Sequence, residues 1–296
     1  MKVDYSYVDT FLKVIDGTTD IKELANNVGF QTIISHAKVT GNDFDLKTVD
    51  EAVKGINNKA YGLTNVIKNV DAIKDVYRDL RFHEKEWIEK IEAYTRKLFY
   101  DIKNDSIILY PVIGYDIGIG INNIVCVNLN SEICLRDCRE LISIIIHETT
   151  HVYYEHIHGS CLDYFKLETP EEMKKLLDNA IQYEGAGVFS AKDYRERNGL
   201  PKYGTGIQED YNTSNKRSIK LFQEYKNITK SLANGDIKDK EEFLLRVFGE
   251  SKLVHRLGYS IFNQIEKIEG IDGVKRAIHI DNESFIKDFL NISFFK

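Results

Sequence analysis

The chain has 296 residues, 43% hydrophobic and 29% charged, which is the composition of an ordinary globular protein long enough to bury a core. Its 40 Lys and Arg against 46 Asp and Glu give a formal net charge of −6, without the basic surplus that nucleic-acid binding requires. No apolar run approaches the roughly 20 residues that cross a bilayer, and the start at Met1 lacks the apolar segment of a signal peptide. We therefore expect a cytoplasmic protein with no nucleic-acid partner and no membrane partner.

The first hundred residues predict one helix after another. Apolar residues recur at helical spacing over 63–80 and again over 87–102. Asp45 can cap a shorter helix that directly follows it. The pattern then changes to short apolar segments rich in β-branched residues. This change predicts two parts, a helical N-terminal region over 1–104 and a second domain over 105–296.

Three segments after this boundary predict a small sheet. They are residues 106–110, 115–121 and 124–129. We expect Pro111 to close the first segment and Asn122–Asn123 to form the turn between the other two. Glycines inside a strand mark places where another backbone comes close, and here they are Gly118 and Gly120. Two interpretations stay open, a strand that pairs with an extended peptide substrate or a hairpin that only covers the core.

The rest of the chain predicts mainly helices. One helix is expected to begin at a cap near Ser131 and to continue to Gly159. The segment Thr169–Glu172 has the pattern of a helix start, with threonine as the cap, proline at the first position and glutamate at the third. A further helix is expected over 253–268, with Gly270 as its stop.

The segment 147–151, His-Glu-Thr-Thr-His, has the pattern H-E-x-x-H. On a helix, positions i and i+4 lie on the same face one turn apart, so His147 and His151 can bind a single ion. Glu148 then lies beside the ion, where it can take a proton from water. The segment predicts a Zn²⁺ site with Glu148 as the general base of a hydrolysis.

Catalytic zinc normally has three protein ligands and a water. Glu155 lies about 12 Å along the helix axis from His147, too far to share one ion with it. Glu184 follows on the next expected helix, which could present one turn to the metal if it packs antiparallel to the first. The small residues 185–187 allow these two backbones to approach closely. We expect Glu184 to be the third ligand; the alternative is an exposed helical glutamate without a role.

Segment 147–151, followed by Tyr183-Glu184-Gly185-Ala186, resembles the gluzincins, zinc peptidases with two histidines and a downstream helical glutamate. The chain is most similar to predicted bacterial zinc-dependent peptidases whose second motif reads E-G-x-A. Gly258-Tyr259 also resembles the G-Y start of their C-terminal helix. The resemblance covers 118–270 in three short blocks. In the thermolysin branch an aspartate follows the glutamate ligand by one turn and orients a histidine, whereas this chain has Gly187 and Val188 there.

The resemblance implies an α+β, predominantly helical chain whose zincin-like catalytic core has a small sheet over the active-site helix. It implies a zinc peptidase that acts on a peptide or protein substrate. A donor must then stabilise the oxyanion of the reaction. Tyr259 is the first candidate and His255 the second, since they lie at i and i+4 on one helical face. Both residue types are also common in packing on buried helices, so that alternative stays open.

Two other functions are compatible with the sequence. One is a protein of the same fold that holds zinc without cleaving a substrate, although the intact Glu148 favours an enzyme. The other is a helical interaction protein in which the H-E-x-x-H pattern is a coincidence. Metal content and catalysis distinguish the three, because the last predicts no bound zinc and the second predicts zinc without turnover.

Overall fold

The computed structural model describes residues 1–56, 61–99, 106–159, 167–200, 214–237, 239–249 and 251–290. The chain forms two compact units. The first comprises Met1–Lys97 and Asp101–Val152, and the second comprises Leu98–Tyr100 and Tyr153–Lys296. The strands thus belong with the N-terminal helices in the first unit, whereas we placed a boundary between them at residue 104.

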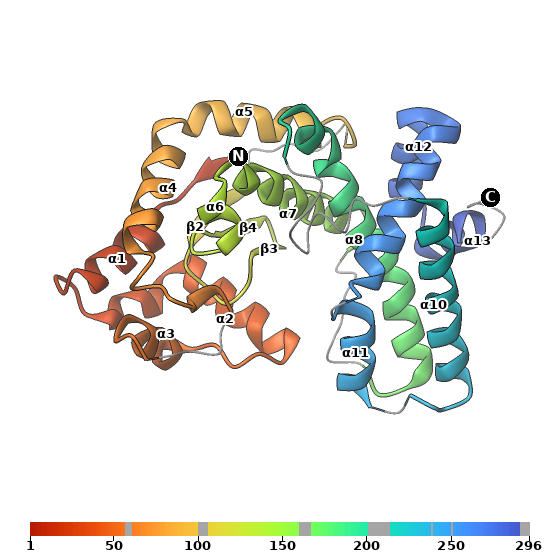
Figure 1. Cartoon of the computed structure of the whole chain (residues 1–296), viewed down its shortest axis with the longest axis horizontal. Helices are drawn as coiled ribbons and strands as arrows, with labels where there is room; N and C mark the ends of the chain where they lie inside the picture. The colour runs from red at the N-terminus through yellow and green to blue at the C-terminus, as the bar shows by residue number, and fades with distance from the viewer. Residues whose placement is uncertain are drawn as a thin grey trace. The chain divides into compact units, whose positions relative to one another are not determined.

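Helices predominate in both units, and the strands form one small sheet, which confirms the expected α+β class (Figure 1). The first unit contains β1 (Lys2–Val3), α1 (Ser6–Ile15), η1 (Ile21–Asn26), α2 (Val28–Thr40), α3 (Leu46–Val53), η2 (Tyr61–Leu63), α4 (Val70–Phe82), α5 (Glu84–Thr95), β2 (Ile108–Val112), β3 (Gly118–Ile121), β4 (Ile124–Asn128) and α6 (Glu132–Arg136). Helix α7 (Arg139–His158) begins in the first unit and ends in the second. The second unit continues with α8 (Pro170–Arg197), α10 (Asn215–Ala233), α11 (Lys240–Phe248), α12 (Leu253–His279) and α13 (Asn282–Phe289).

The sheet of the described residues has the strand order β1-β2-β4-β3. Strands β1, β2 and β4 are parallel, and β3 pairs antiparallel with β4 at one edge. The turn between β3 and β4 lies at Asn122 and Asn123, as predicted, with φ of 49° and 64°. The prediction that Pro111 ends its strand is wrong, because Pro111 pairs with Val127 inside β2. Proline has no N–H to donate, and it is tolerated here because β1 pairs only with Ile108 and Leu109. On the β1 side of β2, no described strand therefore needs a hydrogen bond from residue 111.

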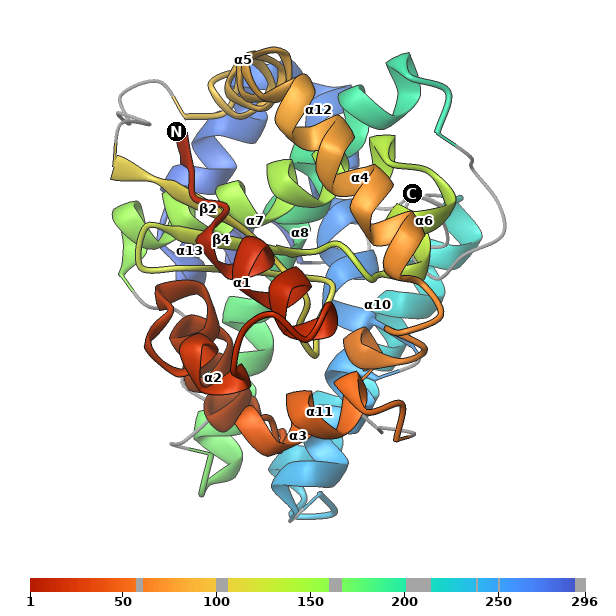
Figure 2. The ribbon, with the colours of Figure 1, turned by 90° about the vertical axis from the view of Figure 1, so that its left-hand side faces the viewer.

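Helices cover both faces of the sheet. Side chains alternate along a strand, so Gly118 and Gly120 face one side of β3 and Ile119 faces the other. Helix α7 packs on the glycine side, where the Gly120 backbone lies against that of Glu148. Helix α2 packs on the opposite face, where Gly29 touches Tyr110 of β2. Figure 2 shows α1 in front of the strands, with α2 below them.

The predicted helix over 63–80 begins later than expected, at Val70. Asn65 has a left-handed backbone with φ of 56°, which helices of L-residues do not continue through. The segment before α4 is held by side-chain hydrogen bonds instead: Asn69 donates to Asn130 at 2.8 Å, and Asn130 donates to the carbonyl of Gly62 at 2.8 Å. These partners, far away in the sequence, compete with helical hydrogen bonds and delay the helix by two turns.

The single helix expected from Ser131 to Gly159 is divided into α6 and α7. Asp137 is extended between them, with φ of −150° and ψ of 105°. Its carboxylate accepts the backbone N–H of Arg139 at 3.1 Å and also binds the Arg139 guanidinium. An aspartate in this position caps a new helix, so α7 starts afresh only two turns before His147. The predicted end is confirmed, since α7 stops at His158 and Gly159 has φ of 75°.

The second unit is built around long helices that lie side by side, α8, α10 and α12 (Figure 1). The predicted start of α8 is confirmed by a complete capping box between Thr169 and Glu172, with Pro170 at the first helical position. The predicted stop at Gly270 is confirmed: its backbone is non-helical, with φ of 69° and ψ of −169°, and a second helical segment follows it within α12, up to His279. None of the described helices is long and apolar enough to cross a membrane.

Candidate metal centre

The H-E-x-x-H segment is helical, and its two histidines converge. His147 and His151 lie one turn apart in α7, with 2.9 Å between their Nε2 atoms and 4.6 Å between their ring centroids. Two imidazole nitrogens bound tetrahedrally to one zinc at 2.0–2.1 Å would be about 3.3 Å apart. His151 is buried, with only 4% of its surface exposed. The pair therefore directs two nitrogen donors to one point, as the sequence predicts.

Strand β3 lies directly against Glu148. A Cβ atom added at Gly118 would lie 2.7 Å from Glu148 Oε1, and one added at Gly120 would lie 2.2 Å from the Glu148 carbonyl oxygen. A side chain at Gly120 would meet the backbone of α7 and displace the strand, whereas one at Gly118 would displace the Glu148 side chain. The prediction that these glycines mark a close approach of another backbone is confirmed at Gly120, while Gly118 lies against the Glu148 side chain. Since β3 is an edge strand of the described sheet, the glutamate lies beside the sheet edge.

Glu184 is buried in α8, with 8% of its surface exposed, and is not the exposed glutamate of the alternative interpretation. Beside it, α8 crosses α12 at a contact of two glycines: a Cβ atom on Gly185 would be 2.6 Å from Gly258 Cα. The two helices run parallel here, since Glu184 contacts His255 and Lys192 contacts Glu266. A backbone does approach closely at Gly185, but it belongs to α12, whereas we expected the helix that bears the two histidines.

His255 and Tyr259, the two candidate oxyanion donors, both lie on α12 in the second unit. His255 Nε2 is 3.1 Å from Glu184 Oε2, and 21% of the His255 side chain is exposed. Tyr259 is 3% exposed, and its ring packs beside Phe189 with 6.4 Å between centroids. The contact between His255 and Glu184 is not predictable from the sequence, because no local pattern relates residues that are so far apart in the chain.

The end of α7 packs on α8 inside the second unit. The Tyr154 ring meets the Tyr183 ring edge to face, with 5.5 Å between centroids. His158, one turn further, interacts through Nε2 with the carbonyl oxygen of Ile278 at 2.7 Å. Tyr154 follows His151 by three residues in the same helix, and Tyr183 immediately precedes Glu184. The two helices that bear the predicted ligands thus meet within one turn of each ligand.

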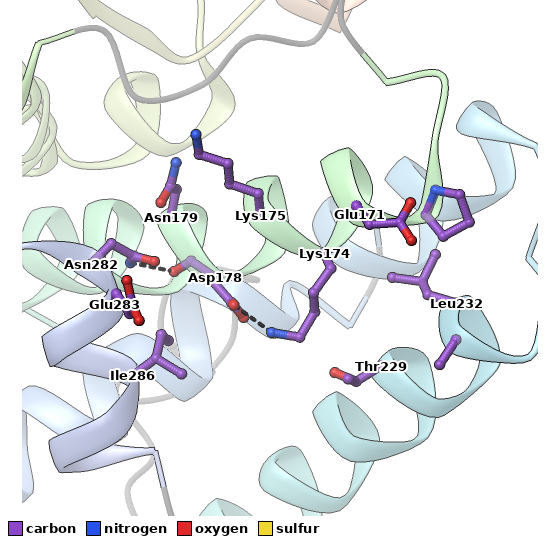
Figure 3. A pocket seen from close by; sticks show the side chains of 12 residues that line it. Glu171, Lys174, Lys175, Asp178, Asn179, Thr229, Leu232, Asn282, Glu283 and Ile286 are labelled. Carbon is purple, nitrogen blue, oxygen red and sulfur yellow. Dashed lines mark hydrogen bonds and ion pairs between the residues drawn. The ribbon is translucent and has the colours of Figure 1, made fainter.

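A pocket of about 550 Å³ lies elsewhere in the second unit, between α8, α10 and α13 (Figure 3). In it Lys174 forms an ion pair with Asp178, and the Tyr225 hydroxyl donates to the same carboxylate at 3.0 Å. Burial raises the pKa of Asp178, while Lys174 and Tyr225 oppose that rise. Asn282 donates to the Asp178 carbonyl at 2.9 Å. None of the predicted site residues lines this pocket, and its central carboxylate already has its partners, so we assign it no part in the metal centre.

Comparison with known proteins identified no relative. No family model, no curated protein and no solved structure matches this chain. The case for a function therefore depends on the residues of the two units themselves.

Proposed function

We propose that this protein is a zinc-dependent peptidase with a zincin-like core, in which His147, His151 and Glu184 hold the ion and Glu148 is the general base. The observation that carries the proposal is the convergence of the two histidine Nε2 atoms, 2.9 Å apart, on a helix that also bears Glu148. Two histidines and a glutamate are an established ligand set of catalytic zinc. Imidazole nitrogens also argue against magnesium and calcium, which prefer oxygen ligands alone.

The continuity of α7 supports Glu184 as the third ligand. Because His151 and Tyr154 lie in one unbroken helix, the packing of Tyr154 on Tyr183 brings this part of α7 to the turn of α8 that bears Glu184. His147, His151 and Glu184 make up a group that could hold a metal ion.

The proposed roles follow from the chemistry of each group. When bound, zinc lowers the pKa of a coordinated water to about 7 and polarises the carbonyl of the scissile bond. Glu148 accepts the proton of the attacking water and passes it to the leaving amine. Tyr259, or else His255, donates to the developing oxyanion. The edge strand β3 beside Glu148 favours an extended peptide as the substrate, because the backbone of an edge strand can pair with one.

The first test is the metal content of the purified protein, measured by mass spectrometry on the wild type and on Glu184→Ala. We expect about one zinc per wild-type chain and a large loss in the variant. Glu196→Ala is the matched control, because it removes an exposed glutamate from the same helix and should leave the zinc in place. Zinc retained in full by Glu184→Ala would mean that another residue is the third ligand. A wild type without zinc, even after reconstitution, would refute the metallopeptidase and favour the interaction protein.

A further inference from the structure

The carboxylate of Glu184 has a built-in partner on the neighbouring helix. His255 Nε2 lies 3.1 Å from Glu184 Oε2, and both side chains are largely buried, with 21% and 11% exposed. The two residues are held opposite each other by the glycine crossing next to them. Gly185 follows Glu184 directly, Gly258 follows His255 by three residues, and their backbones are in contact. The contact therefore belongs to the packing of α8 on α12 and does not depend on a flexible surface side chain.

A carboxylate ligand needs such a partner. Glutamate has three rotatable side-chain bonds, and ordering them on metal binding has an entropic cost. Residues that hydrogen-bond a ligand carboxylate reduce this cost and keep one oxygen directed at the ion, and their loss typically weakens metal binding 10–100-fold. Here the imidazole Nε2 lies 3.1 Å from Oε2 and can hold the carboxylate in one orientation.

We propose that His255 is a positioning residue that orients Glu184 as a zinc ligand. This inference rests on the proposed zinc site and deepens it. It gives His255 a role that does not require contact with the substrate, and it leaves Tyr259 as the candidate for the oxyanion. In this role the imidazole donates its Nε2–H to the carboxylate.

The test compares zinc affinity, measured by competition with a chromogenic chelator, in the wild type and two variants. His255→Leu keeps a similar volume and removes the donor, whereas His255→Gln keeps an N–H near the position of Nε2. We expect His255→Leu to bind zinc about 10–100-fold more weakly, and His255→Gln to recover most of the loss. His279→Ala is the control, because it removes an exposed histidine from the last turn of α12 and should leave the affinity unchanged.

The outcomes separate this inference from the proposed function. Wild-type affinity in a folded His255→Leu, or a loss in His255→Gln equal to that in His255→Leu, would overturn the positioning role while the zinc site stands. A wild type that binds no zinc would refute the site itself and the inference with it. If His255→Leu does not fold, His255→Asn replaces it, because asparagine stays polar but is too short to reach Glu184. The absorption spectrum of the Co²⁺-substituted proteins gives a second measurement, since a displaced ligand changes it and a purely structural loss of stability does not.

Discussion

The glycine crossing of α8 and α12 allows a sharp test of the second unit through Gly258→Ala. The added Cβ would lie 2.1 Å from the carbonyl oxygen of Ile181 and 2.6 Å from Gly185 Cα. Carbon and carbonyl oxygen make contact at about 3.3 Å, so the helices would have to separate by about 1.2 Å. Both contacts are with backbone atoms of a helix, which cannot move aside as a flexible side chain can.

The expected loss of stability follows from two opposing terms. Overpacking of a well-filled interface costs about 1–3 kcal/mol, and a contact with rigid backbone belongs at the upper end of that range. Alanine favours the helix over glycine by about 1 kcal/mol, which offsets part of the cost. The net loss is about 2 kcal/mol, which corresponds to a fall in Tm of about 4–8 °C for a chain of this size.

Thermal unfolding of the zinc-free protein, followed by circular dichroism, measures this loss. Lys267→Ala is the matched control, because it places the same side chain on the exposed surface of the same helix and should change the Tm little. The double variant Gly185→Ala with Gly258→Ala should lose less than the sum of the single losses, since the first substitution already separates the two backbones. A Gly258→Ala protein as stable as the wild type, or more stable, would refute the crossing.

Three further predictions concern Glu148, its neighbouring strand and a helix cap. Glu148→Gln should lower kcat on a peptide substrate about 10²–10⁴-fold and leave the zinc content unchanged, because glutamine cannot take a proton; undiminished turnover would exclude Glu148 as the base. Gly118→Ala should lower activity and change the Tm little, since its Cβ would meet the end of the flexible Glu148 side chain at 2.7 Å. A large fall in Tm with unchanged activity would contradict the placement of Gly118 beside the Glu148 carboxylate. The Asp45→Asn variant should lose less stability in acid than the wild type does, because hydrogen bonds from Thr48 hold the pKa of Asp45 below its ordinary 3.8. That contribution is present above pH 3.8 and is lost as the pH falls through the lowered folded pKa, so urea unfolding at pH 7 and pH 3 should differ less in the variant than in the wild type.

Local patterns in the sequence predicted much of what lies within one or two helical turns. The i, i+4 spacing of His147 and His151 was enough to predict converging donors, because helix geometry alone puts them on one face. The capping box at Thr169 and the turn at Asn122–Asn123 were equally local, and both are present. In each case the residues that determine the structure are neighbours in the chain.

Contacts between distant segments decided the rest. Asn130 holds the segment before α4 in place of an earlier helical turn, and the extended Asp137 divides the helix expected to lead into the site. Above all, the partners of Glu184 and Gly185 are His255 and Gly258, more than seventy residues away. A single sequence contains no periodic signal of such a pair, because only the packing of α8 on α12 brings the two segments together.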